Sequence, residues 1–399
     1  MLRFCTAGES HGESLIAVLS GAPAGLEIDF PMVERELWRR QQGYGRGGRM
    51  RIEHDTAHFL SGVRHGKTIG SPISIEIANR DWKNWEQSLP VEAGDPEKHK
   101  RVASPRPGHA DLAGALKYNL PEARYVLERA SARETAARVA LGAVAKLLLR
   151  SIGIEVFSHV IAVGKAIYQP PRVSREELRA LAAKAEILLS VLDADAEQRM
   201  KAEVDRALRT GDSVGGVFEV RVFGAPPGLG SYANWDERLD AQLAAAVMSL
   251  QAVKAVEIGS GVASATDFGS RVHDAIHYAS EEADADSNQQ RHTRFRREQN
   301  HAGGLEGGVT NGEDVVVRGY LKPISTLRRP LASVDFATRE AVKAAYERSD
   351  VCVVPAAGVV AEAMVALTLA RNALEKFGGD SMTELLRNHE NYVRQLATY

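Results

Sequence analysis

Arginines and glycines alternate in the segment that follows the first expected helix. The arginines are Arg39, Arg40, Arg46, Arg49 and Arg51, and glycines stand at positions 43, 45, 47 and 48. Arginine carries a planar, permanently charged fork that matches phosphate and carboxylate, and glycine lets the backbone bring several forks onto one small ligand. The pattern predicts a site for a small polyanion. Two alternatives stay open, a basic loop without a ligand and an RGG-like nucleic-acid segment.

A second anion site is expected at the start of an alanine-rich helix, where Arg129, Ser131 and Arg133 stand close together. Ser131 and Glu134 fit a capping box, and the helix is expected to run to about Arg150. A helix N-terminus offers unpaired N–H groups and partial positive charge, which suits an anion. Simple capping with solvent-exposed arginines is the alternative.

Backbone amides supply a third possible phosphate site. Residues 300–312 hold five glycines, and residues 322–326 follow shortly afterwards with a lysine, a serine and a threonine. Glycine-rich loops can cradle phosphate through their N–H groups, although the signal is weak by itself. Neither a P-loop nor a dinucleotide fingerprint is present, because Val309 and Thr310 stand where a P-loop needs its lysine, and Gly259 and Gly261 lack the third glycine.

Two of the histidines, His11 and His109, stand in glycine-flanked turns beside polar residues. An imidazole can exchange protons near neutral pH because its ordinary pKa is about 6.5. Both are candidates for acid–base chemistry, and a structural or solvated histidine is the alternative. The pairs His54/His58 and His273/His277 have metal-like spacing, but both segments resemble strands, on which i and i+4 lie too far apart for one ion. We expect no metal site.

The composition of the chain limits the classes of protein to which it can belong. The chain has 399 residues, 44% hydrophobic and 26% charged, with a formal net charge of -2, so no global attraction to nucleic acid or anionic lipid is expected. Two cysteines are too few for a disulfide framework. The N-terminus lacks the pattern of a signal peptide, and Pro355, Gly358 and Glu362 interrupt the longest apolar run. We therefore expect no membrane span and a cytoplasmic protein.

Secondary-structure patterns indicate a mixture of helices and strands without a repeat. Strands are expected at residues 1–6, 14–20, 315–321 and 351–354, and helices at 29–43, 131–150, 235–256, 336–347 and 361–377. Residues 81–107 look like a charged surface excursion. Residues 173–210 look like a peripheral helical pair that opens with a Ser174/Glu177 capping box, and we interpret them as a solvated structural insertion.

Eight segments taken together resemble the chorismate synthase family in its longer bacterial form. The resemblance covers essentially the whole chain in order, and its segments are residues 8–12, the arginine segment through 47–49, 106–111, 129–135, 211–216, 300–312, 322–326 and 348–350. It implies an α+β fold of one domain over residues 1–399, a β-α-β sandwich with a helical layer between antiparallel sheets. Peripheral excursions are expected near 81–101 and 173–210. A homotetramer is also implied.

The resemblance implies a lyase of the shikimate pathway and of aromatic amino acid biosynthesis. Its reaction is the anti 1,4-elimination of phosphate from 5-enolpyruvylshikimate 3-phosphate, which gives chorismate. Reduced FMN serves as an electron donor that is not consumed, so the chain is expected to be a flavoprotein. NADPH is a possible reductant. Because no dinucleotide fingerprint is present, an external flavin reductase is favoured. The alternative functions are a nucleic-acid-binding protein and a zinc hydrolase.

Site residues follow from the resemblance, residue by residue. His109 is expected to protonate the reduced flavin, His11 to protonate the departing phosphate, and Asp350 to help the flavin N5 act as a base. The residues expected to hold FMN are Arg129, Ala130, Ser131, Gln251, Ala252, Gly307, Lys322, Pro323, Ile324, Ser325, Thr326 and Arg348. The residues expected to bind the substrate are Ser10, Arg49, Arg106 and Arg133, with Arg40 and Arg46 serving either the substrate or the phosphate of NADP.

Overall fold

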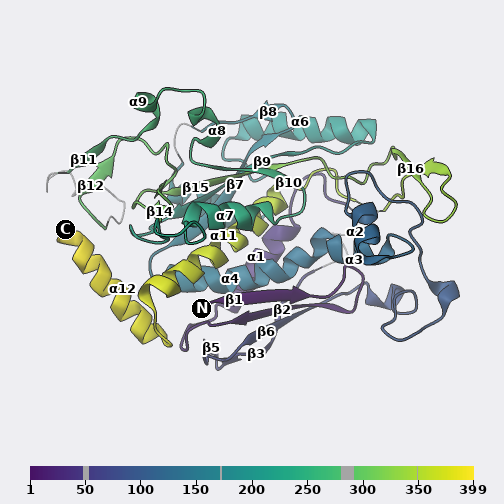
Figure 1. Ribbon diagram of the computed structural model, residues 1–399, viewed down its shortest axis with the longest axis horizontal. Coiled ribbons are helices and arrows are strands. Elements are labelled where there is room, and N and C mark those ends of the chain that lie inside the picture. The colour runs from purple at the N-terminus through teal and green to yellow at the C-terminus, as the bar shows by residue number, and fades with distance from the viewer. Residues whose placement is uncertain (48–53, 171–172, 280–291, 348) are drawn as a thin grey trace.

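Two antiparallel sheets lie on opposite sides of a group of helices (Figure 1). The structure is a computed structural model that describes residues 1–47, 54–170, 173–279, 292–347 and 349–399. Helix α4 (Thr135–Ser151) contacts the first sheet, and helix α11 (Val354–Phe377) contacts the second. The chain therefore has a mixed α and β fold.

The first sheet has four strands in the order β1 (Arg3–Ala7), β2 (Ser14–Ser20), β6 (Ile73–Ala78) and β3 (His58–Ser61). Buried and less buried side chains alternate along β2 and β6, so one face of the sheet is apolar. Ile73, Ile75 and Ile77 are fully buried on that face, which packs against α4. The two N-terminal strands that the sequence predicted are confirmed.

The second sheet has five strands in the order β10 (Val253–Ile258), β15 (Val315–Leu321), β9 (Gly216–Phe223), β7 (Glu155–Val163) and β8 (Ala166–Ile167). Phe218, Val220 and Val222 are fully buried and belong to the same core as α11. Arg318 pairs with Glu219 across strands, and their side chains lie 2.8 Å apart. This sheet thus carries apolar side chains toward the helices and charged ones on the alternate positions.

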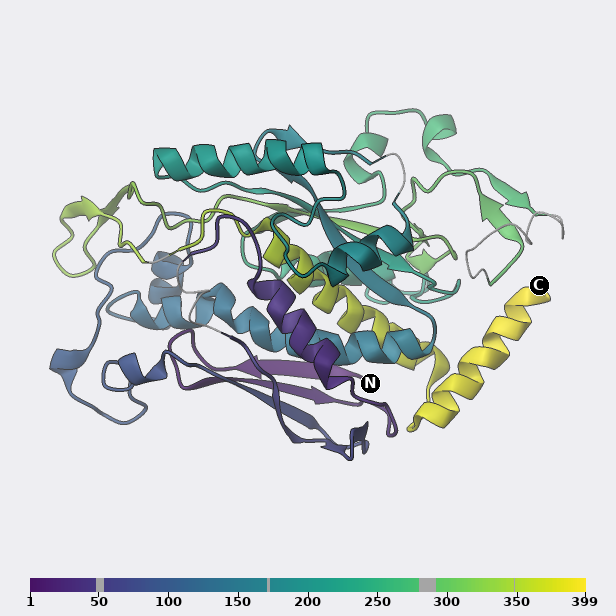
Figure 2. The ribbon, with the colours of Figure 1, turned by 180° about the vertical axis from the view of Figure 1, so that it is seen from behind.

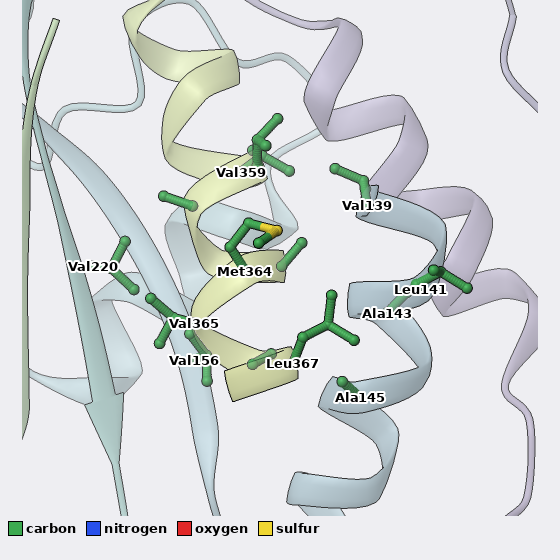
Figure 3. Packing of buried hydrophobic residues seen from close by; sticks show 14 of the residues in the cluster. Val139, Leu141, Ala143, Ala145, Val156, Val220, Val359, Met364, Val365 and Leu367 are labelled. Atoms are coloured by element: carbon green, nitrogen blue, oxygen red, sulfur yellow. The ribbon is translucent and has the colours of Figure 1, made fainter. Parts of the chain in front are cut away.

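Helices α4 and α11 approach each other unusually closely. A Cβ added to Gly142 would lie 2.2 Å from the Cβ of Ala363, so only glycine fits at this crossing. Around it, Val139 of α4 and Met364 and Leu367 of α11 lie between the two helices (Figure 3). Helix α1 (Phe30–Gln41) packs against both α4 and α11, as the view from behind shows (Figure 2).

A buried cluster of charges connects these three helices. Arg39 of α1 lies 2.7 Å from Glu362 of α11, and Lys146 of α4 lies 2.6 Å from Glu36 of α1. Ser158 of β7 donates to Glu362 at 2.6 Å. Burial raises the pKa of Glu36, but the charges of Arg39 and Lys146 outweigh it and lower that pKa to about 2. Glu36 therefore stays ionised, and the ion pairs of the cluster connect α1, α4 and α11.

Several predicted elements are wrong in their bounds or type. The helix expected at 235–256 is shorter, α7 (Leu239–Met248), because Ala252 has a φ of 69° and the chain then enters β10. The helix expected at 336–347 is a hairpin of β16 (Ala332–Val334) and β17 (Ala341–Lys343). The strand expected at 351–354 is not formed, because Val351–Val353 lead directly into α11, which has Pro355 in its first turn.

The remaining elements are short or peripheral. Helix α12 (Met382–Ala397), which the sequence analysis did not anticipate, carries the C-terminus away from the sheets (Figure 2). The others are β4 (Val63–Arg64), β5 (Lys67–Thr68), η2 (Trp82–Asn84), η3 (Pro96–Lys98), α2 (Asp111–Tyr118), α3 (Arg124–Ala130), η4 (Ala132–Glu134), α5 (Arg175–Ala183), α6 (Ala194–Thr210), α8 (Gly261–Ser264), α9 (Gly269–Val272), β11 (Ile276–Tyr278), β12 (Phe295–Arg297), β13 (Leu305–Glu306) and β14 (Val309–Thr310).

Helix α11 is long and apolar enough to cross a membrane by length and composition alone. However, 83% of its most apolar stretch is buried inside the protein. It is thus the central helix of the core.

Replacement of Glu362 by alanine is expected to lower the free energy of unfolding by about 3–5 kcal/mol, because Arg39 and Lys146 would keep buried charges without this partner. Urea unfolding monitored by circular dichroism measures the change. Glu375→Ala, which removes a surface pair with Arg371 on the same helix, is the control and is expected to cost less than about 1 kcal/mol. Equal effects of the two substitutions would contradict the role given to the cluster.

Candidate active site

A cavity of about 880 Å³ opens where α1 ends and where α4 and α11 begin. It collects most of the residues that the sequence analysis singled out. From the predicted sets, the lining includes Ser10, His11, Arg40, Arg46, Arg106, His109, Ala130, Ser131, Arg133, Gln251, Ala252, Lys322, Pro323, Ile324, Ser325, Thr326 and Asp350. Residues from at least seven separate segments therefore meet at one place.

His11 is fixed on two sides. Its Nδ1 lies 2.9 Å from Oε1 of Glu128, and its backbone N–H donates to the same carboxylate at 2.8 Å. The ring of Trp85 lies against the imidazole, with 3.9 Å between the ring centroids. Burial raises the pKa of Glu128, but the hydrogen bonds and charge of His11 lower it below its ordinary value. An ionised Glu128 accepts the proton on Nδ1, so the lone pair of the neutral ring is on Nε2.

His109 is held by a carboxylate in the same way. Its Nδ1 lies 2.5 Å from Oδ1 of Asp111, whose other oxygen accepts from Nε of Arg106 at 2.8 Å. Asp111 is fully buried, and burial raises its pKa. The hydrogen bonds from His109 and Arg106 outweigh burial and hold that pKa well below its usual range. Asp111 therefore orients one basic residue and one imidazole at the edge of the cavity.

Arg40 and Arg133 share one buried carboxylate. Nη1 of Arg133 lies 2.5 Å from Oδ1 of Asp55, and Nη1 of Arg40 lies 3.3 Å from Oδ2. Nε of Arg40 also donates to Thr135 at 2.9 Å. All three charged side chains are nearly buried, so Asp55 balances part of the positive charge that lines the cavity.

Asp350 binds two residues of the arginine segment, the stretch that contains Arg39, Arg40 and Arg46. Its Oδ2 lies 2.9 Å from Nη1 of Arg46, and its Oδ1 accepts from the backbone N–H of Gly47 at 2.5 Å. The observed partners are Arg46 and Gly47, and Asp350 itself lies in the lining of the cavity.

The residues predicted to hold the flavin form another wall. Gln251 donates to Glu134 at 2.9 Å, and Ala252, in the left-handed region, accepts from the N–H of Lys322 at 3.0 Å. Strained backbone of this kind concentrates at functional sites. A Cβ on Gly215 would lie 2.2 Å from the carbonyl oxygen of Leu321, which explains a glycine in the predicted segment 211–216.

Three hydrogen bonds connect this wall to neighbouring segments. Ser213 donates to the carbonyl oxygen of Ile324 at 2.6 Å, and Arg106 donates to Thr326 at 3.0 Å. The ammonium group of Lys322 donates to the carbonyl oxygen of Gly108 at 2.5 Å. Burial and the nearby Lys254 lower the pKa of Lys322. The wall is thus joined directly to the turn that carries His109.

The capping box expected at Ser131 is wrong in its details. Ser131 accepts from the N–H of Arg133 and caps a 3-10 turn, and α4 starts only at Thr135. The carboxylate of Glu134 does not accept from the backbone N–H of Ser131, as a capping box requires, because it binds Arg138 and Gln251. Of the residues expected to form an anion site here, Ser131 and Arg133 line the cavity beside Thr135, the first residue of α4.

Two of the predicted residues that the structure describes, Arg129 and Gly307, are not brought to the cavity. The guanidinium of Arg129 donates to the carbonyl oxygens of Thr6 and Gly8, and it is not among the cavity's lining residues. Gly307 lies in the turn between β13 and β14 and is also absent from the lining. Arg49 and Arg348 lie outside the residues that the structure describes. The assignment of these four residues stays a prediction.

Sequence reasoning missed the carboxylates and the aromatic ring that orient the site. Asp55 and Glu128 had no motif of their own, and Trp85 belongs to the segment interpreted as a charged surface excursion. That interpretation is incomplete, because Asp81, Asn84 and Trp85 line the cavity. The only available signal was the tryptophan itself, a large apolar side chain in a charged segment.

The described parts of the chain contain no group of three or more metal-ligating side chains close enough to hold an ion. Neither histidine pair lies on one helix, since His58 is in β3 and His277 is in β11.

Comparisons with known proteins agree with the motifs at this site. The family model "Chorismate synthase" matches residues 2–374. The chorismate synthase of Acidobacterium capsulatum is 70% identical and that of Koribacter versatilis is 68% identical, each over 100% of both chains. The chain belongs to the chorismate synthase family. A crystal structure of a chorismate synthase with 40% identity superimposes with a TM-score of 0.77, covering 100% of this chain and 99% of that one.

Most of the family segments recognised in the sequence are also found around the cavity. Among them, residues 106–111 and 322–326 supply adjoining walls of one cavity. The two alternative functions, nucleic-acid binding and zinc-dependent hydrolysis, receive no support from these comparisons.

Asp111 gives a prediction on pH and stability. Its pKa is depressed in the folded state, so its contribution is present above the unfolded pKa of about 3.9 and is lost as the pH falls toward the folded pKa. Asp111→Asn is expected to be less stable than the wild type at pH 6, and the difference is expected to shrink by roughly 1 kcal/mol by pH 3. Urea unfolding at a series of pH values measures it. A difference that stays constant or grows on acidification would contradict the ion-pair geometry.

Proposed function

We propose that this cavity is the active site of a lyase that converts 5-enolpyruvylshikimate 3-phosphate to chorismate by anti 1,4-elimination of phosphate. The observation that carries the proposal is the convergence of two carboxylate-oriented histidines with Arg40, Arg46 and Arg133 in one cavity of a chorismate synthase family member. The substrate carries a phosphate and two carboxylates, and arginine stays charged when it is desolvated against such groups. The reaction is the last common step of the shikimate pathway.

The cavity fits reduced FMN as well as the substrate. A volume of about 880 Å³ is in the upper range for a small-molecule site. Val353, Ala357 and Val360 supply apolar surface for a flavin ring, and the polar wall of Gln251 and Lys322–Thr326 supplies donors and acceptors. When bound, reduced FMN supplies electron density that helps phosphate leave, and it recovers that density as hydrogen departs from C6. There is no net redox change.

His11 is proposed to give a proton to the departing phosphate. Its Nδ1 donates to Glu128, so the transferable proton is on Nε2 of the imidazolium. The hydrogen bond to Glu128 orients the ring, and its contact with Trp85 restricts its rotation. The two contacts together keep the acid in one orientation while the phosphate leaves.

His109 is proposed to protonate the reduced flavin. Asp111 sets the orientation of its ring, and the adjacent Lys322 and Thr326 belong to the wall proposed to hold the flavin. Nη2 of Arg106 lies 3.0 Å from Nδ1 of His109, so the ring is in contact with both Asp111 and Arg106.

Asp350 is proposed to help the flavin N5 act as the base that removes the C6 hydrogen. Its position in the lining supports this role, and its contacts with Arg46 and Gly47 give it a second task. Substrate binding and proton removal would then depend on the same carboxylate.

Arg106, Arg133 and Ser10 are proposed to bind the substrate, together with Arg49. Arg40 and Arg46 are proposed to meet either the substrate or the phosphate of NADP.

Further properties are proposed from family membership. The layers of helices and sheets are the expected β-α-β sandwich, formed as one domain over residues 1–399, and the active protein is a cytoplasmic homotetramer. FMN is also held by Arg129, Ala130, Ser131, Gly307 and Arg348. An external flavin reductase supplies the reduced cofactor, with NADPH as the alternative reductant.

An anaerobic assay tests the function. The purified protein is mixed with 5-enolpyruvylshikimate 3-phosphate and either photoreduced FMN or FMN with NADPH, and chorismate and phosphate are measured. Chorismate is expected with photoreduced FMN in equal amounts to phosphate. Oxidised FMN without a reductant is the control and is expected to give none. Failure to form chorismate with photoreduced FMN would contradict the proposed function.

His109→Ala is expected to reduce turnover by roughly 10²–10⁴-fold while substrate affinity stays nearly intact, because it removes a general acid and leaves the arginines in place. Stopped-flow measurement of single turnover, with calorimetry for affinity, checks both parts. His99→Ala serves as a matched control, since His99 pairs with Glu122 and is not among the cavity's lining residues. A His109→Ala enzyme with unchanged turnover would remove this residue from the mechanism.

A further inference from the structure

The helical segment 173–210 contacts the arginine segment directly. The N–H of Tyr44 donates to the carbonyl oxygen of Leu188 at 2.7 Å, and the hydroxyl of Tyr44 donates to Oδ1 of Asp205 at 2.6 Å. The ammonium group of Lys201 lies 4.8 Å from the centre of the Tyr44 ring. Backbone and side chain of Tyr44 are therefore both held by this segment.

Gly45 is enclosed between the same segment and the chain before α11. It has a φ of 84°, and a Cβ added to it would lie 2.7 Å from Cγ1 of Val204 and 3.4 Å from Cβ of Cys352. Its carbonyl oxygen accepts from the N–H of Val351 at 2.8 Å. Only glycine fits this position, where the chain must pass close to α6 and take a left-handed conformation.

The segment that provides this support is itself part of the core. Met200 and Val204 are fully buried and belong to the main hydrophobic cluster, as does Leu189. The N–H of Val160 in β7 donates to the carbonyl oxygen of Ser190 at 2.9 Å. The interpretation of residues 173–210 as a solvated insertion is therefore wrong for the inner face of α6, which is anchored to the second sheet.

The residue after this support, Arg46, is one of the cationic residues that line the cavity. Arg46 follows Gly45 directly, lines the cavity and pairs with Asp350 at 2.9 Å. A hydrogen bond at Tyr44 and close packing at Gly45 thus restrict the backbone immediately before Arg46. Restricting a binding group in advance lowers the entropic cost of binding.

We propose that residues 173–210 form a seat for the arginine segment, and that Tyr44 and Asp205 are positioning residues which set the affinity of the cavity for a phosphate-bearing ligand through Arg46. The proposal rests on the proposed function of the cavity. It assigns the segment a task in binding and none in the chemical step.

Kinetics with four variants test the proposal. Tyr44→Phe and Asp205→Ala each remove the hydrogen bond, and each is expected to raise KM for 5-enolpyruvylshikimate 3-phosphate by roughly 3- to 10-fold with kcat changed less than about twofold. The double variant is expected to show no larger effect than either single one, because both remove the same contact. Asp205→Asn keeps an acceptor oxygen and is expected to retain most of the affinity.

A control and a second measurement separate this proposal from the proposed function. Asp195→Ala removes an exposed aspartate from the same helix and is expected to leave KM unchanged. Hydrogen–deuterium exchange of the amides of residues 44–47 needs no activity, and faster exchange is expected in Tyr44→Phe and Asp205→Ala. Calorimetric titrations with the substrate and with NADPH, each alone, show which phosphate the positioned Arg46 meets.

The outcomes are distinct. If the wild type makes no chorismate, the proposed function fails, and exchange at residues 44–47 still tests the seat. If the wild type makes chorismate but neither KM nor exchange changes in Tyr44→Phe and Asp205→Ala, the positioning role is overturned. A loss of kcat with unchanged KM and unchanged affinity would also overturn it, because the seat is assigned to binding only.

Discussion

Positive charge that is taken out of water must be balanced nearby, and this constraint organises the whole cavity. Four carboxylates hold basic side chains that face it; Asp350 is itself in the lining, and Asp55, Asp111 and Glu128 are not among the lining residues. Asp55 holds Arg40 and Arg133, Asp111 holds Arg106 and His109, Glu128 holds His11, and Asp350 holds Arg46. The same contacts that offset the cost of burying these charges also fix the orientation of the side chains that carry them. A site that must receive a phosphate and two carboxylates is therefore assembled and positioned by its own counter-charges before any ligand arrives.

The helices between the sheets supply the rigid base for this arrangement. Arg39 and Arg40 are consecutive on α1, so their side chains diverge, Arg39 toward the buried cluster with Glu362 and Arg40 toward Asp55 and the cavity. Packing of α1 against α4 and α11 thus determines where the wall of the cavity lies. The peripheral segments complete it, since Trp85 covers His11 and α6 supports Tyr44. Trp85 thus contacts a residue proposed to act on the substrate, and α6 contacts the two residues immediately before Arg46.

The sequence predicted the residues of the site better than the elements that carry them. Arginine forks, glycine-flanked histidines and the family segments are local patterns, and most of them meet in the cavity. Strands β2 and β15 followed from their apolar residues, and the Ser174/Glu177 capping box is present in α5. The helix expected at 336–347 failed because its alternating hairpin residues also fit a helical pattern. Asp55, Glu128 and Asp205 could not be predicted, since an ordinary aspartate or glutamate acquires its role only through partners far away in the chain.

The central claim is that buried carboxylates orient the two histidines, and NMR of the imidazole nitrogens tests it most directly. Protein labelled with ¹⁵N at histidine, with His11→Gln and His109→Gln used to assign the signals, reports which ring nitrogen carries the proton above the pKa of each imidazole. The structure predicts that the proton is on Nδ1 in both rings, facing Glu128 and Asp111, and that Nε2 carries the lone pair. Glu128→Gln and Asp111→Asn should then alter the signals of His11 and His109, respectively. Neutral rings protonated on Nε2 would contradict the account. Imidazole signals that do not change on these substitutions would also contradict it.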